Sequence, residues 1–228
     1  MSKENNKNIK LRNLSPFMQA FNELPHTIPL LPLANAVIIP DAELPLNIFE
    51  PRYLNLIKDS LKKDRLVGMI QPKNRSSKPD LYAVGCAARI NKYEETNDGR
   101  LEVSLIGLCR FEIKEHLPTV RGYDLIVPDW SKFESDYLQH SSIDNVTKLR
   151  FINSLRSHFT KNKMEVNWQV LEKLTPDKLF HSIFYLLELS DEEKQLLIEI
   201  DTLDERLKAF IAMFEEKGKV CFIPNSFS

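Results

Sequence analysis

The sequence predicts an α+β protein in which a β-rich part comes first and a helical part follows. Short apolar runs, several with period-two alternation and most bounded by turn residues, fill residues 28–130. From about residue 144 the apolar residues recur at helical spacing instead. One helical segment, beginning at Pro51, interrupts the β part. Strands this short and this closely spaced indicate a small barrel or a sandwich, not a parallel α/β sheet.

The expected strands are β-branched or alternating runs that end at proline or at turn residues. We expect Pro29–Leu33 to be an edge strand, because proline cannot donate to a central ladder. Asn97–Gly99 predicts a hairpin turn, after which Leu101–Leu105 alternates and buries one face. The other expected strands are Val37–Ile39, Leu66–Ile70, Tyr82–Ile90, Arg110–Lys114 with Phe111 and Ile113 on its apolar face, and Leu125–Val127.

The helical signals are clearest where helices begin. Pro51 suits a first helical turn, and Thr175-Pro176 combines a cap with a first-turn proline. Ser190–Glu193 and Thr202–Glu205 have the capping-box pattern, and Gly218 predicts the end of the last helix. A short helix is expected over Trp168–Leu174, and the preceding helix is expected to bury Val146, Leu149, Ile152, Leu155 and Phe159.

These patterns divide the chain into five expected parts. They are an N-terminal arm at 1–27, a β subdomain at 28–130, a connector at 131–143, a helical subdomain at 144–218 and a C-terminal tail at 219–228. Trp130 and Phe133 lie near the join. They form either an exposed contact patch or, as the favoured interpretation, part of the core between the subdomains.

The composition argues against several classes of protein. A net charge of -1 lacks the basic excess that is typical of nucleic-acid binding. Three cysteines without a CxxC pair disfavour a disulfide framework or a zinc site and favour the cytoplasm. The N-terminal residues lack the apolar core of a signal peptide, and no apolar run is long enough to span a membrane.

Motifs of catalysis are absent from the sequence. It contains no P-loop, GxGxxG, HExxH or GxSxG motif, and its five histidines show no metal-ligand spacing. We therefore expect no enzyme activity, no metal and no cofactor. An enzyme whose site uses no recognisable motif is the weaker alternative.

An ordered set of motifs resembles the N-terminal substrate-binding domain of ATP-dependent Lon proteases. Pro29–Leu33 is similar to the family's "LPLFPL" strand, and Phe49–Tyr53 is similar to its "FExRY" entry into a helix. Asp98–Phe111 is similar to the "DGRLxVxLxGxxRF" hairpin. The resemblance is clear from Ile28 to Trp130 and weaker up to Phe214, and the other matching runs are Val37–Pro40, Gly68–Ile70 and Tyr82–Ile90.

This resemblance implies a PUA-like β pseudo-barrel followed by an α-helical bundle. It implies a non-catalytic module that binds polypeptide clients or a proteolysis partner. In Lon the ATPase and protease domains follow this region, whereas this chain ends at Ser228, so a stand-alone form is expected. One departure is Asp41, at a turn where many relatives have glycine. Neither the client nor the oligomeric state follows from the sequence.

The segment around the start of the inserted helix supplies the candidate binding residues Glu50, Arg52 and Tyr53. The favoured interpretation is architectural, with Phe49 and Tyr53 in the core and local polar contacts from Glu50 and Arg52. The alternative hypothesis is that Glu50, Arg52 and exposed neighbours line a groove for unfolded or extended polypeptide.

A second function remains open, which is an RNA-binding PUA-like module. Its candidate surface is the basic loop Lys73–Lys78, with Tyr82 as the nearby ring on which a base would stack. Such a loop is more commonly only solvated.

Overall fold

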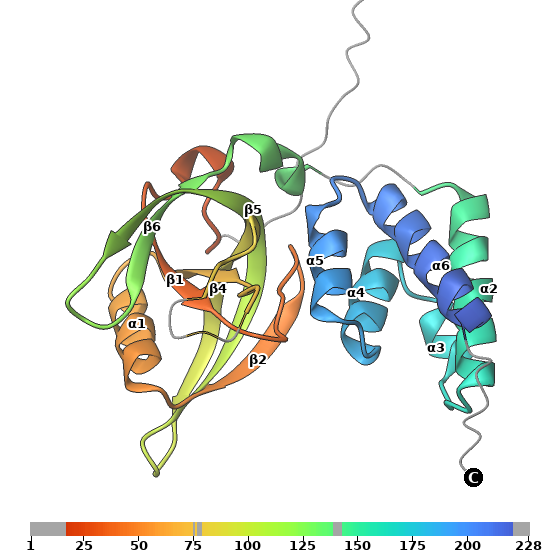
Figure 1. Ribbon diagram of the computed structural model, residues 1–228, viewed down its shortest axis with the longest axis horizontal. Helices are drawn as coiled ribbons and strands as arrows, with labels where there is room; N and C mark the ends of the chain where they lie inside the picture. Colours follow the sequence, from red (N-terminus) through yellow and green to blue (C-terminus); the bar gives the residue numbers. More distant parts are fainter. Residues whose placement is uncertain (1–16, 75, 77–78, 139–142, 221–228) are drawn as a thin grey trace, which may run out of the picture. The chain divides into compact units, whose positions relative to one another are not determined.

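The computed structural model describes residues 17–74, 76, 79–138 and 143–220, and these residues form two compact units (Figure 1). Unit 1 comprises Met1–Gln139 and Ser190–Ile198, and unit 2 comprises His140–Leu189 and Glu199–Ser228. This division differs from the expected subdomain ranges. Residues 131–138 and most of one C-terminal helix pack with the β part.

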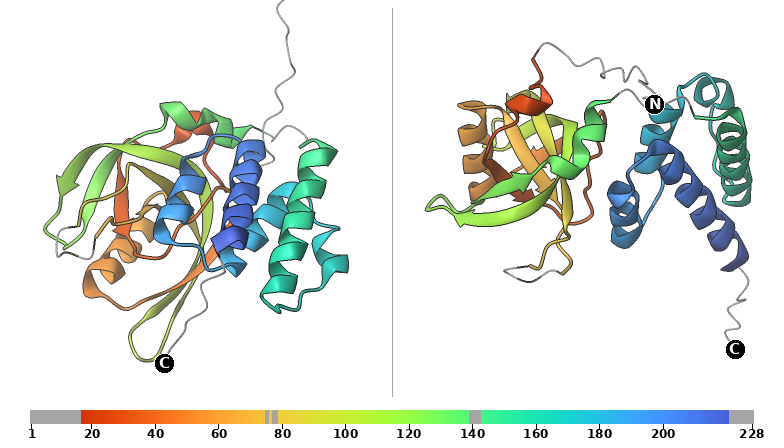
Figure 2. Two further views of the ribbon diagram at one scale, coloured as in Figure 1. Left: turned by 45° about the vertical axis from the view of Figure 1, so that its right-hand side comes forward. Right: turned by 90° about the horizontal axis from the view of Figure 1, so that it is seen from above.

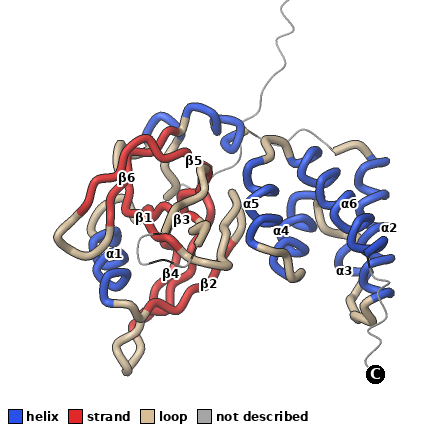
Figure 3. The backbone as a smooth tube through the Cα atoms, in the orientation of Figure 1, coloured by secondary structure: helices blue, strands red, loops and turns tan. Residues whose placement is uncertain are grey.

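Unit 1 is built around a mixed sheet that closes on itself. The strand order is β2-β5-β4-β3-β1-β6, and β6 also pairs with β5. The pairing of β1 with β3 is parallel and the others are antiparallel. The result is the expected PUA-like pseudo-barrel (Figure 3). Its strands are β1 (Ile28–Pro32), β2 (Glu43–Ile48), β3 (Leu66–Ile70), β4 (Val84–Glu95), β5 (Leu101–Pro118) and β6 (Asp124–Asp129).

The prediction that the first strand lies at an edge is wrong, since β1 lies between β3 and β6. Its prolines are tolerated because no β1 residue pairs on both sides. Ile28 and Pro29 pair with β6, whereas Leu30, Leu31 and Pro32 pair with β3. The edge strand is β2, which contains Pro45.

The predicted strand at Val37–Ile39 is also wrong, because these buried residues belong to a loop that crosses β5. Asp41 adopts a φ of 66°, the left-handed conformation that glycine favours, and its N–H donates to the Gly107 carbonyl at 2.9 Å. A Cβ on Gly107 would lie 2.1 Å from the Ile39 carbonyl oxygen. Only glycine fits where the two backbones approach so closely.

The helix α1 (Pro51–Leu61) begins at the predicted proline and covers one side of the barrel. It buries Tyr53, Leu56 and Ile57 and packs against β1 and β3. Elsewhere in unit 1, Trp130 packs against the barrel core and Phe133 is part of it. Ahead of β1 lies the 3-10 turn η1 (Phe21–Glu23).

The long strand β5 does not bury only one face as its alternation predicts. Residues 108–111 are all buried, including Arg110, which is fully inaccessible. The face that carries Arg110 is covered by the 3-10 segment η2 (Ser131–Tyr137) and by the helix α5 (Asp191–Glu199). Both segments lie far from β5 in the sequence, so the local pattern does not reveal them.

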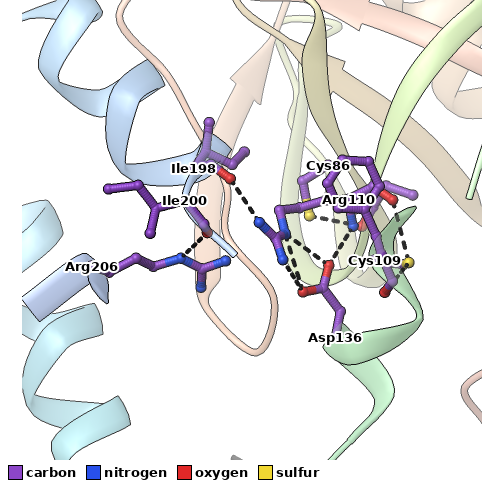
Figure 4. Close-up of polar contacts among 9 residues, drawn as sticks. Cys86, Cys109, Arg110, Asp136, Ile198, Ile200 and Arg206 are labelled. Carbon is purple, nitrogen blue, oxygen red and sulfur yellow. Dashed lines mark hydrogen bonds and ion pairs between the residues drawn. The ribbon is translucent and has the colours of Figure 1, made fainter. Parts of the chain in front are cut away.

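Arg110 is held by a dense set of hydrogen bonds (Figure 4). Its Nε lies 3.1 and 3.0 Å from the two Asp136 carboxylate oxygens, and its Nη2 lies 2.8 Å from Oδ1. Its backbone N–H donates to Asp136 Oδ2 at 2.9 Å. The guanidinium also donates to the Ile198 carbonyl at 3.1 Å and lies 4.8 Å from the centre of the Phe133 ring. Each charge is thus paired and hydrogen-bonded where water is excluded.

A second polar contact holds the start of α5 on the barrel. The buried Gln71 amide donates to the Asp191 carbonyl at 3.0 Å and to the Gln195 side chain at 3.1 Å. Gln195 in turn donates to the Val84 carbonyl at 3.0 Å. The helix starts with the predicted capping box, in which Ser190 and Glu193 exchange hydrogen bonds.

Unit 2 is helical (Figure 2). Its helices pack through aromatic side chains. The Phe151 and Phe210 rings lie 5.7 Å apart between the first and last of its helices. The expected burial of Val146 and Leu149 is wrong, because they are exposed, and the buried face is Thr147, Phe151, Leu155 and Phe159. The last helix continues past Gly218. These helices are α2 (Asn145–Lys161), α3 (Trp168–Leu171), α4 (Pro176–Leu186) and α6 (Leu203–Val220).

The buried ion pair predicts a large loss of stability when one partner is removed. Asp136→Leu leaves the Arg110 charge buried without a counter-charge, and we expect it to lower the free energy of unfolding by about 3–5 kcal/mol. Urea denaturation measures this loss. The exposed Lys132–Glu112 pair, at 2.8 Å, is the control, and Lys132→Met is expected to cost less than about 1 kcal/mol. Equal losses would contradict the assignment.

Candidate functional site

The structure brings the three candidate residues together at the start of α1. The Arg52 Nε donates to the Glu50 carboxylate at 2.9 Å, and its guanidinium lies 4.4 Å from the centre of the Tyr53 ring. The Tyr53 hydroxyl donates to the Pro32 carbonyl at 2.9 Å, and this side chain is buried. Arg52 and Glu50 remain about half exposed, so they are the two of the three that can meet a partner.

Phe49, expected in the core, is 66% exposed. The strand β2 ends at the buried Ile48, and successive side chains of an extended segment point to opposite sides. Phe49 therefore points outward, immediately before the first turn of α1. The architectural interpretation holds for Tyr53 but is wrong for Phe49.

Arg52 also lines a groove of about 970 Å³ in unit 1, which we name the seam groove. One bank is the segment 79–83 and the other is the end of β5. Leu30, Leu81 and Ile113 contribute apolar surface. The other lining residues are Pro32, Pro79, Asp80, Tyr82, Ala83, Glu112, Lys114, Glu115, His116, Pro118 and Asp124. A groove with an apolar floor and polar rim suits a ligand that is itself partly apolar.

The α1 helix fixes the hairpin that forms one bank of this groove. The Asn55 amide donates to the Arg121 carbonyl at 3.3 Å, and the Arg121 guanidinium pairs with Asp59. The Tyr123 hydroxyl donates to the Asp59 carboxylate at 2.9 Å. These contacts attach the loop between β5 and β6 to the helix that carries Arg52 (Figure 1). The bank and the candidate residues therefore form one rigid frame.

The electrostatics of Asp59 support this frame. Partial burial by itself would raise the pKa of the Asp59 carboxyl, but the hydrogen bond from Tyr123 and the charges of Arg121 and Lys62 outweigh it. The pKa of Asp59 is therefore held below its ordinary value of 3.8. Burial and the same hydrogen bond raise the pKa of Tyr123. Asp59 is thus an ionised anchor across the neutral range.

The lining of the seam groove carries four carboxylates and two permanently cationic side chains. Both cations already have partners, since Lys114 pairs with Asp129 and Arg52 with Glu50. Among the carboxylates, Glu112 pairs with Lys132. The other three, Asp80, Glu115 and Asp124, have no basic partner within the described part of the chain. The rim therefore favours cationic groups.

Sequence reasoning identified Arg52 but missed both banks of the groove. The expected strand Arg110–Lys114 includes only the start of one bank, and the expected strand Tyr82–Ile90 includes only the end of the other. The one available signal was Pro79, which ends a polar loop just ahead of the apolar Leu81 and Tyr82. That these two segments face each other follows from strand pairing, which no local pattern shows.

The alternative RNA surface is only partly visible, because residues 75, 77 and 78 of the basic loop lie outside the described residues. Lys73 lies 5.6 Å from the centre of the Tyr82 ring. No group of three His, Cys, Asp or Glu side chains within the described residues is placed to hold a metal ion. Nor is any of the helices that the structure describes long and apolar enough to cross a membrane.

Comparison with known proteins links most of the described region to one family. The family model for the substrate-binding domain of the ATP-dependent protease La (LON) matches residues 27–215. Lon protease 2 of Myxococcus xanthus is 25% identical over 211 residues, which cover 89% of this chain and 25% of that protein. Lon protease 1 of Hydrogenovibrio crunogenus is 28% identical over 82% of this chain and 23% of its own length. The chain thus spans about a quarter of these relatives.

Solved structures show the same fold. The Lon N-terminal domain protein from Xanthomonas campestris superposes with a TM-score of 0.60 at 23% identity, covering 82% of this chain and 97% of its own. The N-terminal domain of Mycobacterium avium complex Lon protease also gives 0.60, at 14% identity, over 83% and 98% of the two chains. At these identities the likeness concerns the fold alone.

The anchor at Asp59 predicts a pH-dependent contribution to stability. Its folded-state pKa lies below the ordinary value, so the contribution is present above that value and is lost as pH falls through the folded pKa. Asp59→Asn should therefore be less stable than the natural chain at neutral pH. The difference should shrink progressively below about pH 5. Urea denaturation from pH 7 downward measures it, and a difference that does not change with pH would refute the anchor.

Proposed function

This chain belongs to the family of LON substrate-binding domains, and we propose that it is a non-catalytic recognition module that binds polypeptide segments in the seam groove. The observation that carries the proposal is the groove itself, with an apolar floor next to the exposed start of α1. Unfolded clients expose apolar side chains that such a floor can cover. In this proposal the bound segments are clients of a proteolytic or quality-control partner.

Arg52 is suited to hold the backbone of a bound segment. A guanidinium has five N–H donors, and among the contacts described for Arg52 only its Nε donates, to Glu50. Glu50 and the Tyr53 ring hold the side chain in place over the helix start. The remaining donors are available to peptide carbonyl oxygens. Glu50 and Tyr53 then act by positioning Arg52.

The groove favours polypeptide over RNA. Three of its carboxylates, Asp80, Glu115 and Asp124, lack a basic partner among the described residues, and they would repel phosphate groups. Cys86 and Cys109 are buried and are not joined in a disulfide, which suits a reducing compartment, so we propose the cytoplasm as the place of action.

Arg52→Ala is expected to weaken the binding of a reduced and alkylated, permanently unfolded test protein by about tenfold, because a polar anchor at the groove is lost. Fluorescence anisotropy with the labelled test protein measures the dissociation constant. A second variant, Leu81→Ser, removes part of the apolar floor and is expected to weaken binding to a similar extent.

Arg100→Ala is the matched control. Arg100 pairs with Asp98 at 2.9 Å and its side chain is 51% exposed, while Arg52 pairs with Glu50 at 2.9 Å and is 50% exposed. Both pairs join residues two apart, but Arg100 lies outside the groove. Thermal denaturation checks that each variant is folded. Unchanged binding by folded Arg52→Ala and Leu81→Ser would sink the proposal, and so would an equal loss with Arg100→Ala.

A further inference from the structure

We infer that the ligand of the seam groove adds to the barrel as a β-strand along the free edge of residues 113–118 in β5, and that it alternates apolar with basic side chains. This inference rests on the proposed function and specifies how the groove binds and what it selects. It follows from the pairing of β5, the position of segment 79–83 and the charges of the rim.

The pairing of Glu112 defines the two edges of β5. Glu112 pairs with Val84 of β4 and with Asp129 of β6, so these two strands lie on opposite edges. Beyond Glu112, β6 continues along its edge to the Pro118–Asp124 pair. The β4 strand begins at Val84, and no other described strand continues along its edge. Residues 113–118 therefore have one paired and one open edge.

The segment that would have extended β4 along this edge turns away from it. Leu81 forms a bridge with Pro72, and the Lys73 N–H donates to the Asp80 carbonyl at 2.7 Å. The Tyr82 N–H donates to the Gln71 carbonyl at 3.0 Å. These contacts extend the β3–β4 hairpin and separate it from β5. The seam groove lies between the two.

An open edge of this kind is a template for strand addition. Its N–H and C=O groups can pair with an extended segment, which gives affinity without demanding a particular sequence. The end of β5 is solvent-exposed at Lys114, Glu115 and His116. Charged side chains on an exposed edge limit pairing with arbitrary segments. The side chains of the bound segment therefore decide which segments the edge accepts.

The side chains around the edge specify that chemistry. In an added strand, successive side chains point to opposite sides. One set meets the apolar surface of Leu30, Leu81 and Ile113. The other set meets a rim on which Glu115, Asp80 and Asp124 have no basic partner within the described residues. Lysine or arginine alternating with aliphatic residues fits both sides.

The test uses the full chain and a labelled peptide of alternating valine and lysine that is long enough to span residues 113–118. A peptide of alternating valine and glutamate is its counterpart. At low salt we expect the lysine peptide to bind at least about tenfold more tightly, because the unpaired rim is acidic. Equal binding, or preference for the glutamate peptide, would overturn the charge assignment.

Backbone methylation of the peptide tests strand addition directly. Methylating every second amide of the lysine peptide in one frame is expected to weaken binding by about tenfold or more, and in the other frame to leave it nearly unchanged. Only one set of amides faces the edge. When the lysine peptide binds, hydrogen exchange should slow at those amides of residues 113–117 that face the open edge. Methylation effects of equal size in both frames would refute strand addition.

Glu115→Lys provides the reversal on the protein side. This substitution should weaken binding of the lysine peptide and strengthen binding of the glutamate peptide. Glu102→Lys is the matched control, because Glu102 is an exposed glutamate on the same strand and lies outside the seam groove. If Glu102→Lys reversed the preference between the two peptides to the same extent, the assignment to this rim would be overturned.

The outcomes separate this inference from the proposed function. If the unfolded test protein binds in an Arg52-dependent way but exchange at residues 113–117 does not slow, the proposed function stands and strand addition fails. If neither the test protein nor the peptides bind, both fail. Exchange at residues 113–117 is also measured without peptide at several protein concentrations. If it slows as the protein concentration rises, the edge binds a second copy of this chain, and the polypeptide assignment is overturned.

Discussion

The buried ion pair between Arg110 and Asp136 is the interaction on which unit 1 depends. The Arg110 side chain has no exposed surface, and its burial is tolerated because its donors have acceptors. Its Nε and Nη2 donate to the Asp136 carboxylate, and its Nη1 donates to the Ile198 carbonyl near the end of α5. Arg110 lies in β5, Asp136 in η2 and Ile198 near the end of α5. The pair therefore fixes where both later segments cover the barrel. The Arg110 guanidinium also packs against the Phe133 ring.

The placement of α5 changes how the chain is divided. The chain leaves unit 1 after η2, returns for Ser190–Ile198, and leaves again for α6. Ile198 is held by Arg110, and the start of the same helix is held through Gln71 and Gln195. Cutting the protein into an N-terminal β part and a C-terminal helical part would remove the cover of the Arg110 face. Burial of that charge depends on a segment far along the sequence.

The seam groove is a consequence of the length of β5. This strand pairs with β2 near its start, with β4 along most of its length and with β6 at its end, which closes the barrel. Because the pairing of β4 with β5 stops at Glu112, whereas the pairing of β6 continues to Pro118, one edge of the last β5 residues has no described partner strand. The α1 helix, through Asp59, keeps this end in place beside Arg52. Closure of the barrel and the open edge therefore arise from the same strand.

The sequence by itself determined the α+β class, the order of most elements, the helix start at Pro51, the capping box at Ser190 and the family. These features depend on contacts within a few residues, or on motifs along the chain, and are visible in the linear pattern. Only the tertiary structure decided that Arg110 is buried, that Phe49 is exposed and that two distant segments form a groove beside Arg52. Each of these depends on which segments, remote in sequence, cover a given face or leave it open. The alternation of apolar and polar residues along one strand does not show which distant segments pack against it.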